Sequence, residues 1–421
     1  MVIVFLFFQD VLVLAAEQVN VQIKQLSWAE AIQTLKSQNS AVTAAIQNEI
    51  SAQNLVTAAR SGFYPQLNAS AASNRSYLSS AGSEPINSSS AQLNLTQNLF
   101  AGFYDLKKLE QSQENLKDAQ AHLHSVLAQA ISDLKQAVAL LRHAQDSVQL
   151  SQKIQKRRSE NMRIVELRFR GGRENKGAVL LSEAYFHQSK YDLNSALAQK
   201  GLAQIQLNQI LGFEPGMQVQ VSLLAEPLVS PNIEDDRLLA FVLETPDYRQ
   251  ALAQERSSQL SYEMSQAAYY PNLDLSASAG KVDTQFPLQN DKWFVGATLT
   301  IPLFAGGKDY GVVHSNSAKW MAAKANLQTL RNQTLLNIQR TRSEYLLVIE
   351  RFQVEEKFQQ AASLRAEIAR NKYNNGLMSF EEWDQVEGDL ILREKNVLAS
   401  ARDKIIAGAK WEQAVGKGEF P

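Results

Sequence analysis

The chain repeats a set of short motifs at a nearly constant spacing. The sequence FYPQLN at residues 63–68 returns as YYPNLD at 269–274, and LFAGF at 99–103 returns as LFAGG at 303–307. The offsets are 206 and 204 residues. Since internal repetition determines architecture, this spacing indicates two copies of one structural unit.

Glycines further along the chain keep the same spacing. Gly172 recurs as Gly376, and Gly212 recurs as Gly416, each 204 residues later. We therefore expect the following division: a secretory signal at 1–16, a first repeat at 17–212, a linker at 213–233, a second repeat at 234–416 and a tail at 417–421. The apolar start has a signal-like cleavage site at Val13-Leu14-Ala15, and a buried N-terminal segment is the alternative.

Each copy has the same order of expected elements. A helix of about 30 residues (28–60; 235–267) ends at an aromatic-Pro step, because proline disfavours helix in the residue before it. Two extended segments follow, then a very long helix, a glycine turn and a return helix. The two extended segments, the long helix and the return helix cover 66–78, 88–98, 106–169 and 177–211 in the first copy. In the second copy they cover 272–283, 292–302, 310–373 and 380–414.

The long helices carry apolar residues at alternating spacings of three and four. Leu134, Leu141 and Val148 are three such positions, and neither proline nor glycine interrupts 104–170. This heptad pattern predicts antiparallel coiled-coil hairpins, with each long helix about 100 Å long. The alternative to a ring of helices around a water-filled tube is a solvated coiled-coil rod without a lumen.

The extended segments alternate apolar and polar residues, as strands with one dry and one wet face do. Four strands cannot close a barrel, and open edges cannot lie in lipid. Closure therefore requires several chains: three would supply twelve strands, whereas two would supply only eight and make a narrow cylinder. The aromatic-Pro steps, with Trp293 and Phe294, fit either interfacial belts or caps on a core.

Composition excludes several classes of function. Forty-two basic against 43 acidic residues give a net charge of −1, which does not indicate a nucleic-acid surface, and the absence of cysteine excludes thiolate metal sites. No zinc-protease, P-loop or nucleophile-elbow motif occurs, so we predict no enzyme activity, cofactor or metal site. The basic run at Lys153, Lys156, Arg157 and Arg158 is interpreted as a solvated helix face.

The duplicated order, with QNLFAGF at 97–103 and IPLFAGG at 301–307 after the second strand of each copy, resembles the TolC-like outer membrane factor family. The resemblance covers Trp28 to Gly416. It implies a mostly α-helical chain whose four strands join a trimeric twelve-stranded barrel in the outer membrane of a Gram-negative bacterium, above a helical tunnel in the periplasm. The homotrimer would be the exit duct of a tripartite efflux pump or type I secretion system. Its partners would be a periplasmic adaptor protein, an inner-membrane transporter and outer membrane lipid. A non-channel periplasmic coiled-coil scaffold is the alternative function.

The same resemblance assigns roles to the hairpin turns and to the start of the second return helix. The turns would form the adaptor-docking tip, although an ordinary helix C-cap explains their glycines equally well. The tip residues are Arg168, Phe169, Gly171, Gly172, Tyr373, Asn375, Gly376 and Leu377. Glu382, Asp384 and Gln385 would line the closed aperture, where Gln385 replaces an acid of the family pattern. Ser379 and Glu382 also fit a helix capping box, which is the alternative role of Glu382.

Overall fold

The computed structural model describes residues 23–77, 85–214, 216–221, 231 and 235–416. The expected signal at 1–16 and the tail at 417–421 lie outside the described residues. Two compact units are present. The first comprises Met1–Gln38, Leu134–Ala225 and Phe358–Arg402, and the second Asn39–Asp133, Glu226–Lys357 and Asp403–Pro421.

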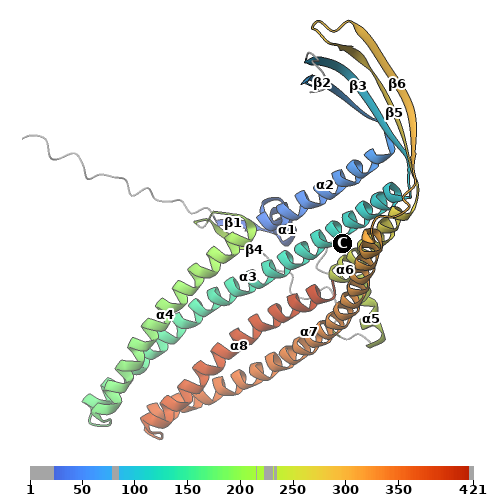
Figure 1. The fold of residues 1–421 in the computed structure, drawn as a ribbon. Coiled ribbons are helices and arrows are strands. Elements are labelled where there is room, and N and C mark those ends of the chain that lie inside the picture. Colours follow the sequence, from blue (N-terminus) through green and yellow to red (C-terminus); the bar gives the residue numbers. More distant parts are fainter. Residues whose placement is uncertain (1–22, 78–84, 215, 222–230, 232–234, 417–421) are drawn as a thin grey trace, which may run out of the picture. The chain divides into compact units, whose positions relative to one another are not determined.

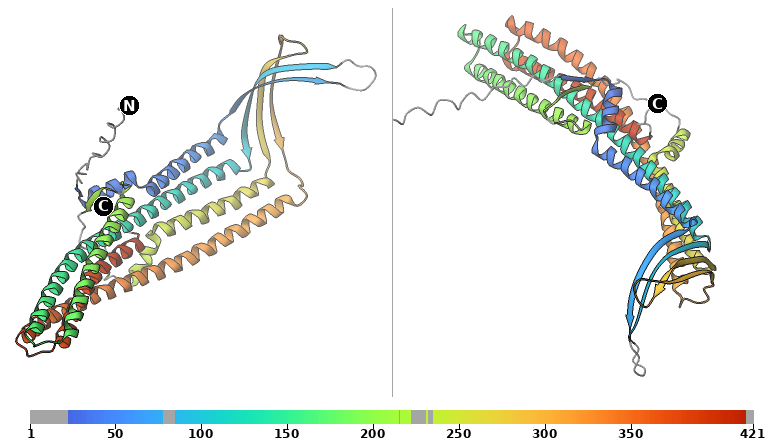
Figure 2. Two further views of the ribbon diagram at one scale, coloured as in Figure 1. Left: turned by 90° about the vertical axis from the view of Figure 1, so that its left-hand side faces the viewer. Right: turned by 90° about the horizontal axis from the view of Figure 1, so that it is seen from above.

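The second unit holds one four-stranded antiparallel sheet with the order β2-β3-β5-β6 (Figures 1 and 2). The strands are β2 (Gln66–Ser76), β3 (Ile86–Ala101), β5 (Asn272–Asp283) and β6 (Asn290–Thr300). Both predicted strand pairs are confirmed. Each repeat supplies one hairpin, and β3 of the first pairs with β5 of the second, so that the two repeats share a sheet.

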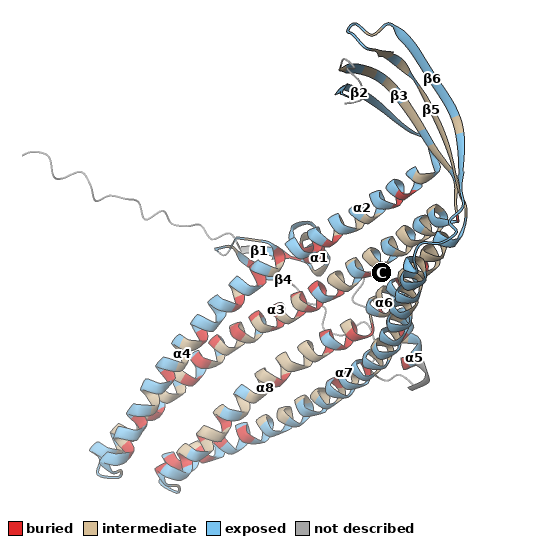
Figure 3. Cartoon of the chain, viewed as in Figure 1, coloured by how far each residue is buried: buried red, intermediate tan, exposed pale blue. Residues whose placement is uncertain are grey.

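Neither face of this sheet is covered (Figure 3). None of the residues in its four strands is buried. Leu67, Leu93 and Leu275 lie on an apolar face, whereas the residue that follows each of them, Asn68, Asn94 and Ser276, lies on a polar face. Within the described chain β2 and β6 are open edges. The sheet is therefore an unfinished structure with one dry and one wet side.

Two helical hairpins follow the strands in sequence. The long helices are α3 (Tyr104–Arg170) and α7 (Lys308–Asn374), of 67 residues each, and the return helices are α4 (Lys176–Leu211) and α8 (Phe380–Ala414). These bounds agree with the predicted ones. Leu134, Leu141 and Val148, seven residues apart, are all buried, as the heptad pattern requires.

The prediction of a single helix at the start of each repeat is wrong in detail. In both repeats a capping residue divides this segment into two helices. Asn39 separates α1 (Trp28–Gln38) from α2 (Ser40–Arg60), and its side chain accepts from the amides of Ala41 and Val42. Thr245 likewise separates α5 (Asp235–Glu244) from α6 (Pro246–Ser265), where proline occupies the first helical position. Short 3₁₀ turns, η1 (Ser61–Phe63) and η2 (Gln266–Tyr269), precede the aromatic-Pro steps.

Two short strands were not predicted. β1 (Ile23–Leu26) and β4 (Gln218–Val221) pair in parallel in the first unit, so the segment interpreted as a linker contains a strand. Val219 and Val221 of β4 are buried. The side-chain amide of Asn208, on α4, holds the turn before β4 by donating to the carbonyls of Glu214 and Met217.

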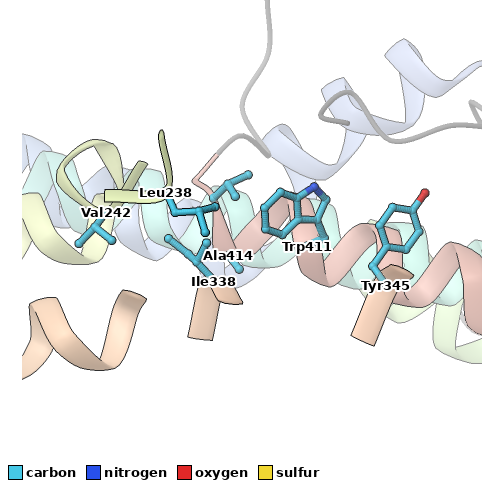
Figure 4. Close-up of a cluster of buried hydrophobic side chains, with 7 residues drawn as sticks. Leu238, Val242, Ile338, Tyr345, Trp411 and Ala414 are labelled. Atoms are coloured by element: carbon cyan, nitrogen blue, oxygen red, sulfur yellow. The ribbon is translucent and has the colours of Figure 1, made fainter. Parts of the chain in front are cut away.

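A compact apolar cluster stabilises the second unit (Figure 4). Leu238 and Val242 of α5 pack with residues of α7 and α8. The indole of Trp411 is fully buried at the centre of this cluster. The other members are Ile338, Tyr345, Ala414 and Val415. Burying these side chains fixes the C-terminal end of α8 against α5 and α7.

The repeated glycines have the same backbone conformation in both copies. Gly172 and Gly376 have φ of 69° and 77°, and Gly212 and Gly416 have φ of 75° and 72°. These left-handed values favour glycine over any other residue. At Gly212 a side chain is excluded sterically as well, since a Cβ would lie 2.6 Å from the Gln38 carbonyl oxygen.

Candidate functional site

The turns of both helical hairpins lie in the first unit and have the same geometry. The amide of Gly172 donates to the Phe169 carbonyl (2.9 Å), and the next amide donates to the Arg168 carbonyl (2.8 Å). In the second turn Gly376 and the residue after it repeat this pattern, with distances of 3.0 and 2.8 Å. Both are Schellman caps with glycine in the left-handed position. The ordinary helix C-cap, given above as the alternative explanation of these glycines, is therefore present at both turns, and adaptor docking stays a prediction.

Tyr373, the last aromatic residue of α7, connects the two turns. Arg168 Nη1 donates to the Tyr373 carbonyl at 2.6 Å, and the Tyr373 hydroxyl donates to Glu174 Oε2 at 3.0 Å. The Arg168 guanidinium also lies 4.5 Å from the centroid of the Tyr373 ring. One side chain thus receives a contact from each side of the first turn.

The Tyr373 ring is fully buried in an aromatic cluster. It stacks on Trp383 with the ring centroids 4.3 Å apart and the planes at 15°, and Phe380 meets it edge-on. Burial, and after it the hydrogen bond to Glu174, raises the pKa of Tyr373 above its ordinary range. Tyr373 therefore stays neutral and keeps its proton available for Glu174.

The other tip residues lie at the surface. Phe169, Asn375 and Leu377 are exposed, and Leu377 is 75% exposed. A Cβ built on Gly172 or Gly376 meets no atom within 4 Å. Gly171 is also exposed. The turns therefore present a shallow surface of backbone and a few apolar side chains, whereas the side chain of Tyr373 is interior.

The aperture residues are in three different environments. Glu382 is exposed and forms the capping box: the Ser379 amide donates to Glu382 Oε2 (3.1 Å), and the Glu382 amide donates to Ser379 Oγ (3.2 Å). Asp384 is paired with Arg158 at 2.6 Å and is only partly exposed. Gln385 is exposed and neutral. Glu382 is therefore the only one of the three with a charge that no ion pair offsets among the described residues.

A group of ion pairs joins α8 to both α3 and α7 near the turns. Arg157 binds Glu394 through two nitrogen–oxygen contacts of 3.1 and 2.6 Å, and Arg370 of α7 donates to buried Glu387 at 3.3 Å. The prediction that the basic run is a solvated face is thus wrong for Arg157 and Arg158, since both face acids of α8. Lys153 and Lys156 are exposed, as predicted.

Sequence reasoning missed Glu174 and the aromatic partners of Tyr373. Glu174 was visible only as an acid after the first turn, and nothing in the sequence relates it to a tyrosine 199 residues away. The Phe380 and Trp383 pair has a signal, because a three-residue spacing places both on one face of a helix. Among the described residues no group of histidine or acidic side chains is arranged to hold a metal ion, and no helix has the length and apolarity of a membrane span.

The model of the outer membrane efflux protein family matches residues 31–213 and 242–417. Comparison with curated protein sequences gives no match. Solved structures share the fold. The CmeC outer membrane channel of Campylobacter jejuni has a TM-score of 0.83 at 17% identity over 93% of this chain and 85% of that one.

Two further structures give the same result. The outer membrane protein VceC of Vibrio cholerae has a TM-score of 0.80 at 19% identity, covering 92% of this chain and 95% of its own. CusC, described in terms of transmembrane channel formation, has a TM-score of 0.83 at 15% identity and 91% coverage of both chains. Likeness at these identities shows a common fold, that of outer membrane channels.

The fold and the family match together define an outer membrane protein of the efflux class. The chain belongs to the outer membrane efflux protein family. It lies in the outer membrane of a Gram-negative bacterium and extends into the periplasm, as the resemblance in its sequence implied.

Proposed function

We propose that the chain is the outer membrane exit duct of a tripartite efflux pump or type I secretion system, conducting cargo passively as a homotrimer. The observation that carries this proposal is the uncovered sheet. Four strands with two open edges, an apolar face and a polar face cannot lie in lipid alone. Three copies supply twelve strands, enough for a closed barrel with a polar lumen.

The tip is the part of the duct that partners would move. Arg168, Tyr373 and Glu174 tie the first hairpin turn to the second through two hydrogen bonds. A periplasmic adaptor that docks on the exposed turns would splay the hairpins only by breaking these bonds. The energy would come from an inner-membrane transporter.

The charge at the start of α8 supports an aperture role for Glu382. Its carboxylate is exposed, and the capping hydrogen bond uses only one of its two oxygens. A ring of three such carboxylates would attract cations at the closed end of the duct. Asp384 contributes less to this field because Arg158 offsets its charge.

The test is the oligomeric state and conductance of the protein extracted from outer membranes. We expect an oligomer of three chains that dissociates on heating and gives single-channel steps in a planar bilayer. A monomer in the native envelope would overturn the proposal. A stable trimer that never conducts would instead support the scaffold function.

A further inference from the structure

One aromatic side chain, that of Phe294, lies on the polar face of the sheet. Along β6 the polar face carries Asn290, Lys292, Phe294, Gly296, Thr298 and Thr300, while Trp293 and Val295 belong to the apolar face. Across Gln66–Ser76, Ile86–Ala101, Asn272–Asp283 and Asn290–Thr300, Phe294 is the only aromatic residue of the polar face.

The strand ladder gives Phe294 polar neighbours only. It lies directly opposite Ser278, which in turn lies opposite Asn94, followed by Asn68. No apolar side chain across the strands covers the ring, and Phe294 is 53% exposed. Burial in a core therefore does not explain a phenylalanine at this position.

Glycine makes room for the ring. A Cβ on Gly296 would lie 2.6 Å from Phe294 Cζ, so the ring occupies the space that a side chain at residue 296 would fill. An aromatic ring laid over a strand glycine is a specific arrangement, since both residues must be present for it to form. It places the ring over the Gly296 position while the side chain of Phe294 stays half-exposed.

A cationic side chain, that of Lys292, lies on the same face of β6 as Phe294. Lys292 is two residues before Phe294 and opposite Gly280, which has no side chain to cover it. The Cα atoms of Lys292 and Phe294 are thus about 7 Å apart along the strand, and a planar ligand of that length can contact the ring and the lysine side chain together. The first repeat has serine at both equivalent positions, Ser88 and Ser90, so a trimer would carry three such pairs rather than six.

We propose that Phe294 and Lys292 form a lumenal site for planar aromatic anions, present three times around the barrel. This inference rests on the trimeric duct proposed above, in which the polar face lines the lumen. A twelve-stranded barrel with strands about 4.8 Å apart and tilted by about 40° has a radius of roughly 12 Å. Aromatic rings on its wall therefore narrow the passage and offer stacking surfaces without closing it.

The first test asks which way residue 294 faces. The chain contains no cysteine, so single Phe294→Cys and Trp293→Cys variants report without background. In this test, the trimer in lipid vesicles would be treated with a charged, membrane-impermeant thiosulfonate. Cysteine at 294 should be labelled, and cysteine at 293, on the neighbouring lipid-facing position, should be protected. Equal labelling, or the reverse order, would overturn the inference.

The second test asks what the site binds. The detergent-purified trimer would be titrated with naphthalene-2-sulfonate. Cyclohexanesulfonate would serve as the non-aromatic control anion. Phe294→Ala should weaken naphthalenesulfonate binding by roughly 2- to 12-fold, the value of one aromatic pair. Lys292→Gln should also weaken it, and Trp293→Ala should not.

Each failure has a distinct meaning. Unchanged binding in Phe294→Ala, in a trimer that still conducts, would overturn the site and leave the duct intact. Equal affinity for the two sulfonates would also overturn the inference that the site prefers aromatic anions. Absence of a conducting trimer in the unmodified protein would overturn the duct itself.

Discussion

At the scale of single residues, Glu382 has two roles that one pair of substitutions can separate. Its carboxylate closes the capping box with Ser379, and glutamine can make the same hydrogen bond without the charge. We expect Glu382→Gln to keep the stability of the protein and to lower the cation preference of the closed channel. Reversal potentials in a salt gradient measure this preference.

The matched variant Glu382→Ala loses both roles. It should lower cation preference as much as Glu382→Gln and should also destabilise the start of α8 by roughly 0.5 to 1 kcal/mol. If Glu382→Gln retains full selectivity, the residue only caps the helix and the aperture role is wrong.

Tyr373 gives a second prediction at this scale. Tyr373→Phe keeps the aromatic stack with Trp383 and removes the hydrogen bond to Glu174. Losing about 1 kcal/mol should raise amide hydrogen exchange in the two turns roughly fivefold. Tyr191→Phe, at a tyrosine 68% exposed on α4, is the control and should change nothing there.

The pH dependence of this effect has a definite sign. Because the folded pKa of Tyr373 lies above the unfolded value, its contribution is complete below about pH 10 and is lost only as pH rises through the raised pKa. The difference between the two proteins should therefore stay constant from about pH 6 to 8. A difference that disappears within that window would show that the tyrosine is not held by this bond.

At the scale of elements, the hairpin turns are where a cap and a docking surface can be distinguished. Gly376 has a φ of 77° and open space beyond its Cα. Gly376→Ala adds backbone strain of about 1 to 2 kcal/mol and no bulk, whereas Gly376→Arg adds the same strain and a long charged side chain. We expect export to survive in the alanine variant and to be lost in the arginine variant, with trimers assembled in both.

Export assays in cells that carry each variant, with trimer content measured in the same membranes, check this prediction. Gly172→Ala and Gly172→Arg should behave in the same way, because Gly172 has the same conformation. Normal export with arginine at either turn would mean that no partner approaches the glycines. Equal loss with alanine would mean that only the conformation of the cap matters.

The sequence allowed most elements to be predicted because their signals are local and repeated. The glycine offset of 204 residues located both hairpin turns, and heptads located α3 and α7. The breaks at Asn39 and Thr245 could not be seen, since one capping residue interrupts an apolar period that continues on both sides.

The site was less predictable because its contacts join distant parts of the chain. The box between Ser379 and Glu382 spans three residues and is visible as a motif. The partners of Arg157 and Arg158 lie 237 and 226 residues away, and a single sequence does not relate them. A charge run was therefore interpreted as solvated although half of it is paired.

At the scale of the whole molecule, the duplication determines what the chain still needs. The two repeats meet where β3 pairs with β5, and this leaves β2 at one edge and β6 at the other. A closed barrel requires that β6 of one chain pair with β2 of the next. Within one chain these edges are three strand spacings apart, about 14 Å, too far for a disulfide.

Cysteine pairs across this seam therefore report only on contacts between chains. We would place one cysteine at Ser70 of β2 and scan a second through Lys292, Gly296 and Thr298 on the polar face of β6. Because side chains alternate between faces, a cysteine at Ala297, on the other face, is the control and should not form the bridge.

We expect one register to give covalent products of two and three chains after oxidation, and none larger. Three is the limit because the third bridge closes the ring and leaves no free edge. A ladder that extends beyond three chains would show an open or larger assembly. Absence of any bridge across the scan, in membranes where the protein is folded, would show that β2 and β6 do not meet and that the sheet is completed in some other way.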